Sequence, residues 1–106
     1  MANIKQLPFG TQTIPFLMNA NSLRVFEKLT GGNILTGDVT INFDGVVKLI
    51  YAGWVEAGIE AREPVNIDER SITITLSENF HQAAAFIDEF KECVTTIVEK
   101  AKATKN

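Results

Sequence analysis

The spacing of apolar and polar residues changes several times along this 106-residue chain, and each spacing predicts an element. Residues 1–18 contain a predicted β-hairpin, with PFG as its turn and TQTIPFLM as its second arm. One face of that arm is apolar and carries Ile14, Phe16 and Met18. Pro15 cannot donate a ladder hydrogen bond, so we expect this arm at a sheet edge or at a bulge.

A helix is predicted over residues 20–30, because its apolar positions recur every three or four residues. Asn19 and Asn21 are both suitable N-cap residues for this helix. The helix is expected to end at Gly31 and Gly32, since glycine readily takes the left-handed conformation at a helix C-terminus. The glycine pair is therefore interpreted first as the C-terminal end of this helix.

The next segment, 39–43, alternates apolar and polar residues, which fits a short strand or an extended connector. Asp44 is the predicted cap of a strong helix over residues 45–62. Apolar side chains cover nearly half the circumference of that helix, and Trp54 lies near the middle of the arc. Such a tryptophan is expected to belong to the core.

The run SITITL, residues 71–76, has the two-residue period of a half-buried strand. Thr75 and Glu78 have the spacing of a capping box, and a long amphipathic helix is predicted over residues 76–102. Its apolar stripe stays in phase throughout, which favours a continuous helix that projects from the domain, although a break near Asp88 would also fit. The stripe consists of Phe80, Ala83, Ile87, Phe90, Val94, Ile97, Val98 and Ala101, with Phe86 and Cys93 at its margin.

These elements predict an α+β fold in one domain, 1–106, with three main helices, a small N-terminal hairpin and a long C-terminal amphipathic helix. Hydrophobic residues make up 45% and charged residues 22%, the mixture of an ordinary folded protein. The single cysteine excludes an internal disulfide and fits a reducing compartment. Prolines and polar residues interrupt the N-terminal apolar residues, so no secretion signal is predicted, and no transmembrane span is visible.

The net charge of −3 is unevenly distributed. Residues 56–92 hold nine acidic residues against three basic ones, a local balance of −6. Nucleic-acid binding requires clustered lysine and arginine, so this pattern argues against it. The acidic middle is read as a solvated surface.

The residue types that carry catalysis are present, but not in a catalytic arrangement. Cys93 and His81 lie twelve positions apart, too far along one helix to form a dyad. The run TINFDG imitates the start of a calcium loop but has Tyr51 where the bidentate glutamate is required. The glycines match no phosphate loop, and Glu56 and Glu60 are assigned to a polar helix face. We therefore expect no enzyme activity, no cofactor and no metal.

One extended pattern in the chain resembles a known family. It consists of the hairpin, the run NANSLRVFEKLTGGNI, an apolar helix containing LIYAGW, an acidic loop and an amphipathic terminal helix. It resembles the tail assembly chaperones of long-tailed bacteriophages over most of residues 11–100. Its sharpest parts are the run Asn-Ala-x-x-Leu-x-x-Phe-Glu-x-x-Thr-Gly ending at Gly31 and the step Tyr51-Ala52-Gly53. SITITL departs from the pattern, because the family is more helical there.

The resemblance implies a non-enzymatic role in the host cytoplasm. Proteins of this family bind the long tape measure protein, keep it soluble and help tail tube protein subunits polymerise around it. They are absent from the finished particle, many have a longer, frameshifted form, and some form homo-oligomers. No nucleic-acid or membrane partner is implied.

A helical, apolar client requires an exposed apolar strip with a polar rim. Our candidate partner-binding strip lies on the last helix and consists of Phe86, Phe90, Cys93, Val94 and Ile97. The alternative for this strip is that it packs wholly against the helix 45–62. Two other functions also stay open: a permanent structural subunit of a phage tail or head-tail connector, and a small enzyme or toxin–antitoxin component.

Overall fold

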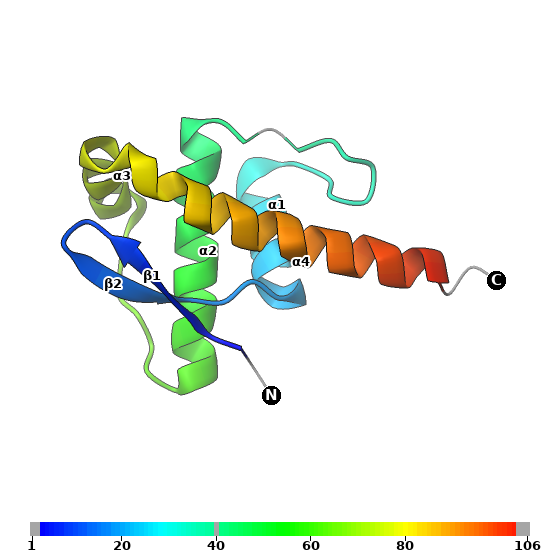
Figure 1. Ribbon diagram of the computed structural model, residues 1–106, viewed down its shortest axis with the longest axis horizontal. Coiled ribbons are helices and arrows are strands. Elements are labelled where there is room, and N and C mark those ends of the chain that lie inside the picture. The colour runs from blue at the N-terminus through cyan, green and yellow to red at the C-terminus, as the bar shows by residue number, and fades with distance from the viewer. Residues whose placement is uncertain (1–2, 40, 104–106) are drawn as a thin grey trace.

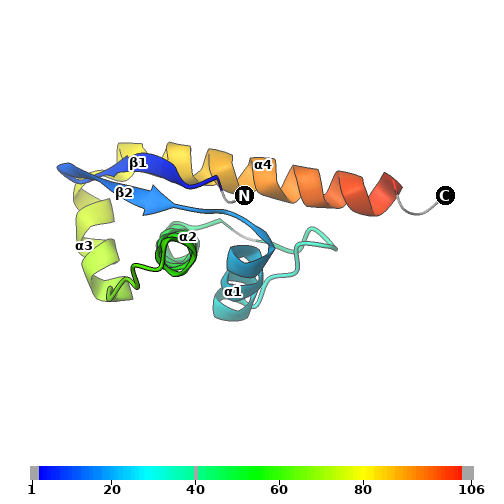
Figure 2. The same cartoon turned by 90° about the horizontal axis from the view of Figure 1, so that it is seen from below.

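The computed structural model describes residues 3–39 and 41–103, and its architecture confirms the predicted α+β class. The hairpin and the last helix form one layer, two helices form the other, and a third helix closes one end (Figures 1 and 2). Buried residues from both layers meet in one hydrophobic core. The elements are β1 (Lys5–Phe9), β2 (Gln12–Phe16), α1 (Ala20–Thr30), α2 (Phe43–Ala61), α3 (Glu69–Glu78), the 3₁₀ turn η1 (Phe80–Gln82) and α4 (Ala83–Ala103).

The hairpin reverses at Gly10 and Thr11, between the paired residues Phe9 and Gln12. Gly10 has a φ of 67°, and Thr11 has a negative φ, the combination of a type II′ turn. The predicted hairpin is confirmed. The predicted turn is placed too early, because Pro8 and Phe9 still pair with β2 and only Gly10 takes the left-handed conformation.

Both strands carry a proline, and the register places each proline so that the hairpin loses no hydrogen bond. Phe9 and Gln12 flank a two-residue turn, so they form a hydrogen-bonded pair, and every second pair along the ladder does the same. Pro8 and Pro15 lie in the intervening pairs, where the backbone nitrogen points away from the partner strand. The prediction that Pro15 lies in an edge strand is confirmed, since the sheet has two strands.

Helix α1 is capped at both ends by residues of the run 19–31. The Asn19 side chain accepts a hydrogen bond from the Ser22 N–H at 3.0 Å, and the Ser22 hydroxyl accepts one from the Asn19 N–H at 2.8 Å. Asn19 is thus confirmed as the N-cap, whereas Asn21 lies inside the first turn. Gly31 ends the helix with a φ of 75°, as predicted.

A buried carboxylate joins α1 to α2. Glu56 of α2 is 8% exposed, and its Oε2 accepts hydrogen bonds from Nδ2 of Asn19 at 3.0 Å and Nδ2 of Asn21 at 3.4 Å. The carboxylate lies at the N-terminus of α1, where the peptide dipoles favour negative charge. The assignment of Glu56 to a polar face is therefore wrong, while Glu60 is exposed as predicted.

Helix α2 begins at Phe43, two residues before the predicted start. Its N-cap is Asn42, which accepts from the Gly45 N–H at 2.8 Å, so the predicted cap Asp44 is wrong. Asp44 instead lies in the first turn and forms an ion pair with Lys48 at 2.6 Å. The segment 39–43 contributes no strand within its described residues, and its residue 40 lies outside them.

The chain leaving β2 passes very close to α2 at Gly53. The Leu17 N–H donates to the Gly53 carbonyl at 3.0 Å, so the linker after β2 is bonded directly to the helix backbone. The Phe16 ring is fully buried and occupies the space that a Cβ on Gly53 would need. Glycine at this position therefore sets the distance between the hairpin and α2.

Phenylalanine rings fix the first half of α4 on the core. Phe86 forms T-shaped contacts with Phe16, at a centroid distance of 5.0 Å, and with Phe9, at 5.9 Å. One helical turn later, the centroid of the Phe90 ring lies 5.0 Å from that of the Phe26 ring of α1. This half of α4 is therefore held by both the hairpin and α1.

Two further side chains support this end of the core. Gln82 accepts from the Gly10 N–H at 2.7 Å and donates to the Gly10 carbonyl at 3.2 Å, so it joins the hairpin turn to the start of α4. Trp54, predicted as core, is half-buried, packs against the core, and lies 6.2 Å from the Phe9 ring.

The predicted strand over residues 71–76 is wrong, because this segment lies in helix α3. Asp68 caps the helix by accepting from the Ser71 N–H, and this hydrogen bond lowers the pKa of its carboxyl. Ile72 and Leu76 are buried together at helical spacing, while Ile74 is exposed. The alternation fits a strand equally well, but the Asp68 cap and the joint burial of Ile72 and Leu76 favour the helix.

The predicted continuous helix 76–102 is interrupted at Asn79, whose φ of −139° is not helical. The side-chain Nδ2 of Asn79 donates to the Thr75 carbonyl at 2.9 Å, which satisfies a carbonyl of the last turn of α3. The predicted capping box of Thr75 and Glu78 is therefore wrong. Helix α4 passes through Asp88 without a break, and its C-terminal half projects beyond the body of the molecule, as Figure 1 shows.

We predict that Gly53→Ala destabilises the protein by about 2 kcal/mol, because the new methyl group must displace the Phe16 ring. Alanine at an ordinary helix position would instead stabilise. Urea unfolding measures the effect. Phe16→Leu frees space, so the two substitutions together should cost less than the sum of the separate effects. Strict additivity would contradict this packing.

We also predict that Glu56→Leu lowers the free energy of unfolding by about 1–2 kcal/mol, since it leaves the Asn19 amide without its acceptor. Glu56→Gln keeps an acceptor oxygen and should lose less. The same substitution at the exposed Glu60 is the matched control. Equal effects at the two positions would show that the Glu56 contact contributes nothing specific.

Candidate partner-binding groove beside the C-terminal helix

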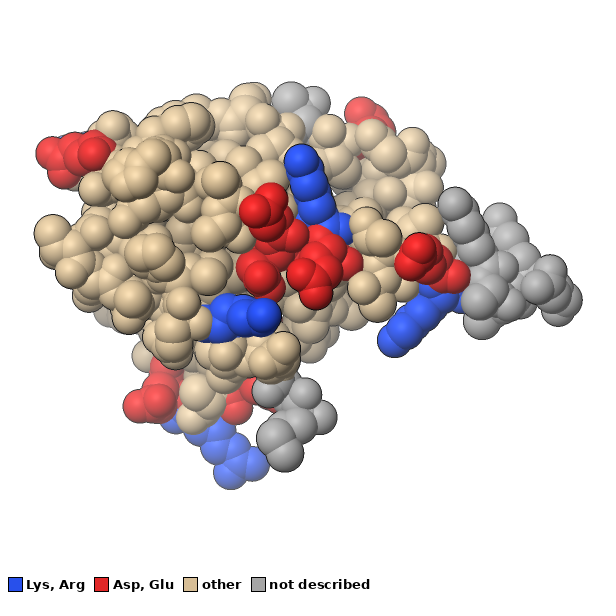
Figure 3. Space-filling view, viewed as in Figure 1, with Lys and Arg blue, Asp and Glu red and all other residues tan. Residues whose placement is uncertain are grey.

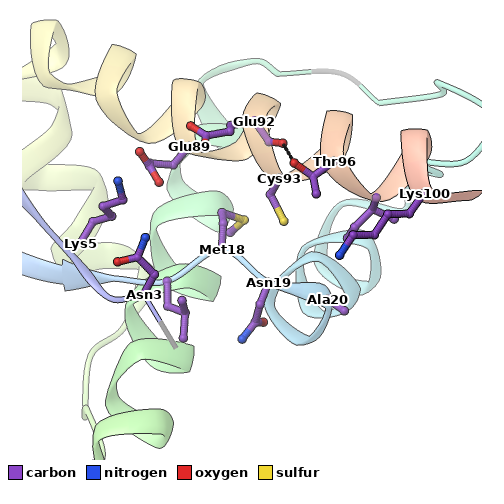
Figure 4. A pocket seen from close by; sticks show the side chains of 12 residues that line it. Asn3, Lys5, Met18, Asn19, Ala20, Glu89, Glu92, Cys93, Thr96 and Lys100 are labelled. Carbon is purple, nitrogen blue, oxygen red and sulfur yellow. Dashed lines mark hydrogen bonds between the residues drawn. The ribbon is translucent and has the colours of Figure 1, made fainter. Parts of the chain in front are cut away.

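An open groove of about 460 Å³ runs between α4 and the linker that joins β2 to α1 (Figure 4). One wall is a flank of α4, and the other consists of the linker, the start of α1 and the residues around the start of β1. The α4 wall contains Glu89, Glu92, Cys93, Thr96, Ile97 and Lys100, and the opposite wall contains Asn3, Lys5, Leu17, Met18, Asn19 and Ala20.

The local structure of each wall explains its position. The α4 residues recur at intervals of three and four, so they share one flank of the helix over about three turns. The linker is held at one end by the Leu17 hydrogen bond to Gly53 and at the other by the Asn19 cap. The groove is therefore built on two braced elements.

The predicted partner-binding strip is divided between the core and the surface. Phe86 is fully buried and Phe90 is 7% exposed, so both rings belong to the core described above. Cys93, Val94 and Ile97 are half-buried, and of these Cys93 and Ile97 line the groove. The role of the strip in binding stays a prediction, which now concerns its C-terminal part.

Charges of both signs border the apolar residues of the groove. Glu89 and Glu92 lie at the middle of α4, Lys5 lies near Glu89 on the other wall, and Lys100 lies toward the C-terminal end (Figure 4). Acidic side chains gather over this middle part of α4 in Figure 3. Among the described residues, the ion pairs within 4.0 Å all involve Lys48, so the groove charges are available to a partner.

Cys93 is the one thiol of the groove, and its surroundings make it a poor nucleophile. Partial burial raises its pKa, and the negative charges of Glu89 and Glu92 raise it further. The thiol therefore stays protonated at neutral pH, whereas the thiolate is the reactive form. Cys93 contributes a small apolar surface to the groove rather than chemistry.

His81 is exposed on η1, away from the groove residues that Figure 4 labels. Within residues 3–39 and 41–103, no three histidine, cysteine or acidic side chains are grouped as metal ligands would be. None of the helices in that part of the chain is long and apolar enough to cross a membrane.

Sequence reasoning missed the linker wall of the groove. Met18 was assigned to the face of a strand, and Leu17 carried no periodic signal, because linkers have none. The bond from Leu17 to Gly53 depends on a contact between distant parts of the chain, which spacing along the sequence does not reveal.

Comparison of the chain with protein-family models, curated proteins and solved structures finds no match. The fold and the groove therefore define the molecule as a small α+β protein with an apolar, charge-bordered surface groove.

We predict that Cys93 is alkylated by iodoacetamide more slowly in the folded protein than in urea. Its raised pKa means that the thiolate appears only at more alkaline pH, so the rate-against-pH curve should lie to the alkaline side of the curve for the unfolded chain. Mass spectrometry measures the rates. Coincident curves would contradict the effect of burial and of the two glutamates.

Proposed function

We propose that this protein is a non-enzymatic tail assembly chaperone of a long-tailed phage, which binds the tape measure protein and assists polymerisation of the tail tube protein. It acts in the host cytoplasm and leaves before the particle is complete. The client segment is an amphipathic helix whose apolar side docks in the groove beside α4. The observation that carries the proposal is the half-exposed apolar flank of α4 over an open groove.

The residues that carry the family resemblance support this proposal through their structural roles. Asn19 caps α1, Leu23 and Phe26 are core, and Gly31 ends the helix. Gly53 holds the linker that forms one wall of the groove. The pattern that prompted the resemblance is thus the pattern that builds the groove.

The helical state of residues 71–76 also agrees with the resemblance. The sequence suggested a departure from the family at this point, where the family is more helical. Helix α3 removes that departure. The strand expected for this segment therefore no longer stands against the resemblance.

The groove suits a helix better than a small ligand. Its α4 wall extends over twelve residues, from Glu89 to Lys100, which is about 16 Å of helix. It is open along its length, and its apolar surface is bordered by polar groups, the arrangement with which proteins bind amphipathic helices. Transient binding also fits a mixed apolar and charged surface.

We predict that Ile97→Asp lowers recovery of co-expressed tape measure protein about tenfold, because it places a charge on the apolar surface of the groove. Thr95→Asp, on the exposed side of α4, is the matched control and should retain binding. Phe86→Asp is unsuitable, since Phe86 is core.

Affinity purification followed by quantitative mass spectrometry measures recovery, and circular dichroism checks that each variant is folded. Equal recovery with both variants would remove the groove as the client site. Detection of the protein in purified virions, at a fixed copy number, would replace the chaperone role with that of a structural tail or connector subunit.

A further inference from the structure

The charges along the α4 wall of the groove follow an order. Glu89 and Glu92 come first, Thr96 is neutral, and Lys100 follows two turns after Glu92. The Thr96 hydroxyl donates to the Glu92 carbonyl at 3.0 Å, so it is already satisfied and needs no polar partner. A helix lying along this wall therefore meets negative charge, then an uncharged step, then positive charge.

The opposite wall is different. Its linker part is formed by Leu17, Met18, Asn19 and Ala20, which carry no charge, and Lys5 stands at the Glu89 end. The two edges of a docked helix would thus face unlike surroundings. Turning a helix end for end in the groove, while its apolar side still faces the floor, exchanges its two edges. A helix with the wrong charge order therefore cannot correct it by binding in the opposite direction, because its charged edge would then face the uncharged linker.

The geometry points to a client segment of defined chemistry: an amphipathic helix with a lysine or arginine opposite Glu92 and, about two turns along the same edge, an acidic residue opposite Lys100. The apolar side of that helix covers Cys93, Ile97 and Met18. This inference rests on the proposed function for the identity of the client. Its charge order, however, follows from the groove alone.

Two synthetic helical peptides of about five turns test the inference. Both have the same leucine stripe and the same composition, with one lysine and one glutamate about seven residues apart on one edge. The matched peptide has the order that faces Glu92 and Lys100 correctly, and the inverted peptide has the two charges exchanged. We expect the matched peptide to bind about tenfold more tightly by fluorescence anisotropy at low salt, and the difference to shrink at high salt.

A charge exchange in the protein provides the decisive comparison. Glu92→Lys combined with Lys100→Glu leaves the net charge unchanged and inverts the order along the wall, so it should reverse the peptide preference. The matched control combines Lys91→Glu with Glu99→Lys, which exchanges charges on exposed α4 residues outside the groove and should leave the preference as it is.

The outcomes separate this inference from the proposed function. Equal affinity for the two peptides, or an unchanged preference after the Glu92 and Lys100 exchange, overturns the inference even where tape measure protein still co-purifies. Charge-ordered peptide binding without recovery of tape measure protein supports the groove inference and overturns the proposed client. A protein that dimerises through this groove and excludes both peptides in sedimentation experiments overturns it in favour of a second copy.

Discussion

The close approach of the hairpin to α2 at Gly53 is the contact on which the rest of the structure depends. The absence of a side chain there lets the Phe16 ring lie against the helix and lets the Leu17 N–H reach the Gly53 carbonyl. The buried ring then provides the surface for Phe86, which seats α4. The bonded linker becomes the wall opposite α4. One backbone position thus determines both the core and the groove.

The residues that carry the family resemblance have structural roles in the fold. Asn19 caps α1 and donates a hydrogen bond to Glu56 of α2. Together with the close approach at Gly53, these contacts fix the positions of α1, α2 and the linker relative to one another. The residues we propose for recognition, such as Ile97 and Lys100, lie outside those runs. Substitutions in the groove can therefore change what it binds without disturbing this framework.

Local signals predicted most of the framework correctly, because helix periodicity, glycine stops and turn residues act over a few positions. The failures came where distant contacts decide. SITITL alternates like a strand, yet a cap at Asp68 and burial of only Ile72 and Leu76 make it a helix. Phe86, Phe90 and Ile97 fall in one predicted partner-binding strip. Rings from the hairpin and α1 bury the first two, whereas Ile97 stays half-buried. The groove itself joins residues about 80 positions apart, as Met18 and Ile97 are, and no periodicity reports that.

The two prolines of the hairpin limit how copies of this protein can aggregate. A cross-β stack requires each outward backbone nitrogen to donate to the next chain, and Pro8 and Pro15 each remove one such rung, on opposite margins of the sheet. Edge-to-edge pairing of the hairpin with another copy is therefore disfavoured on both margins.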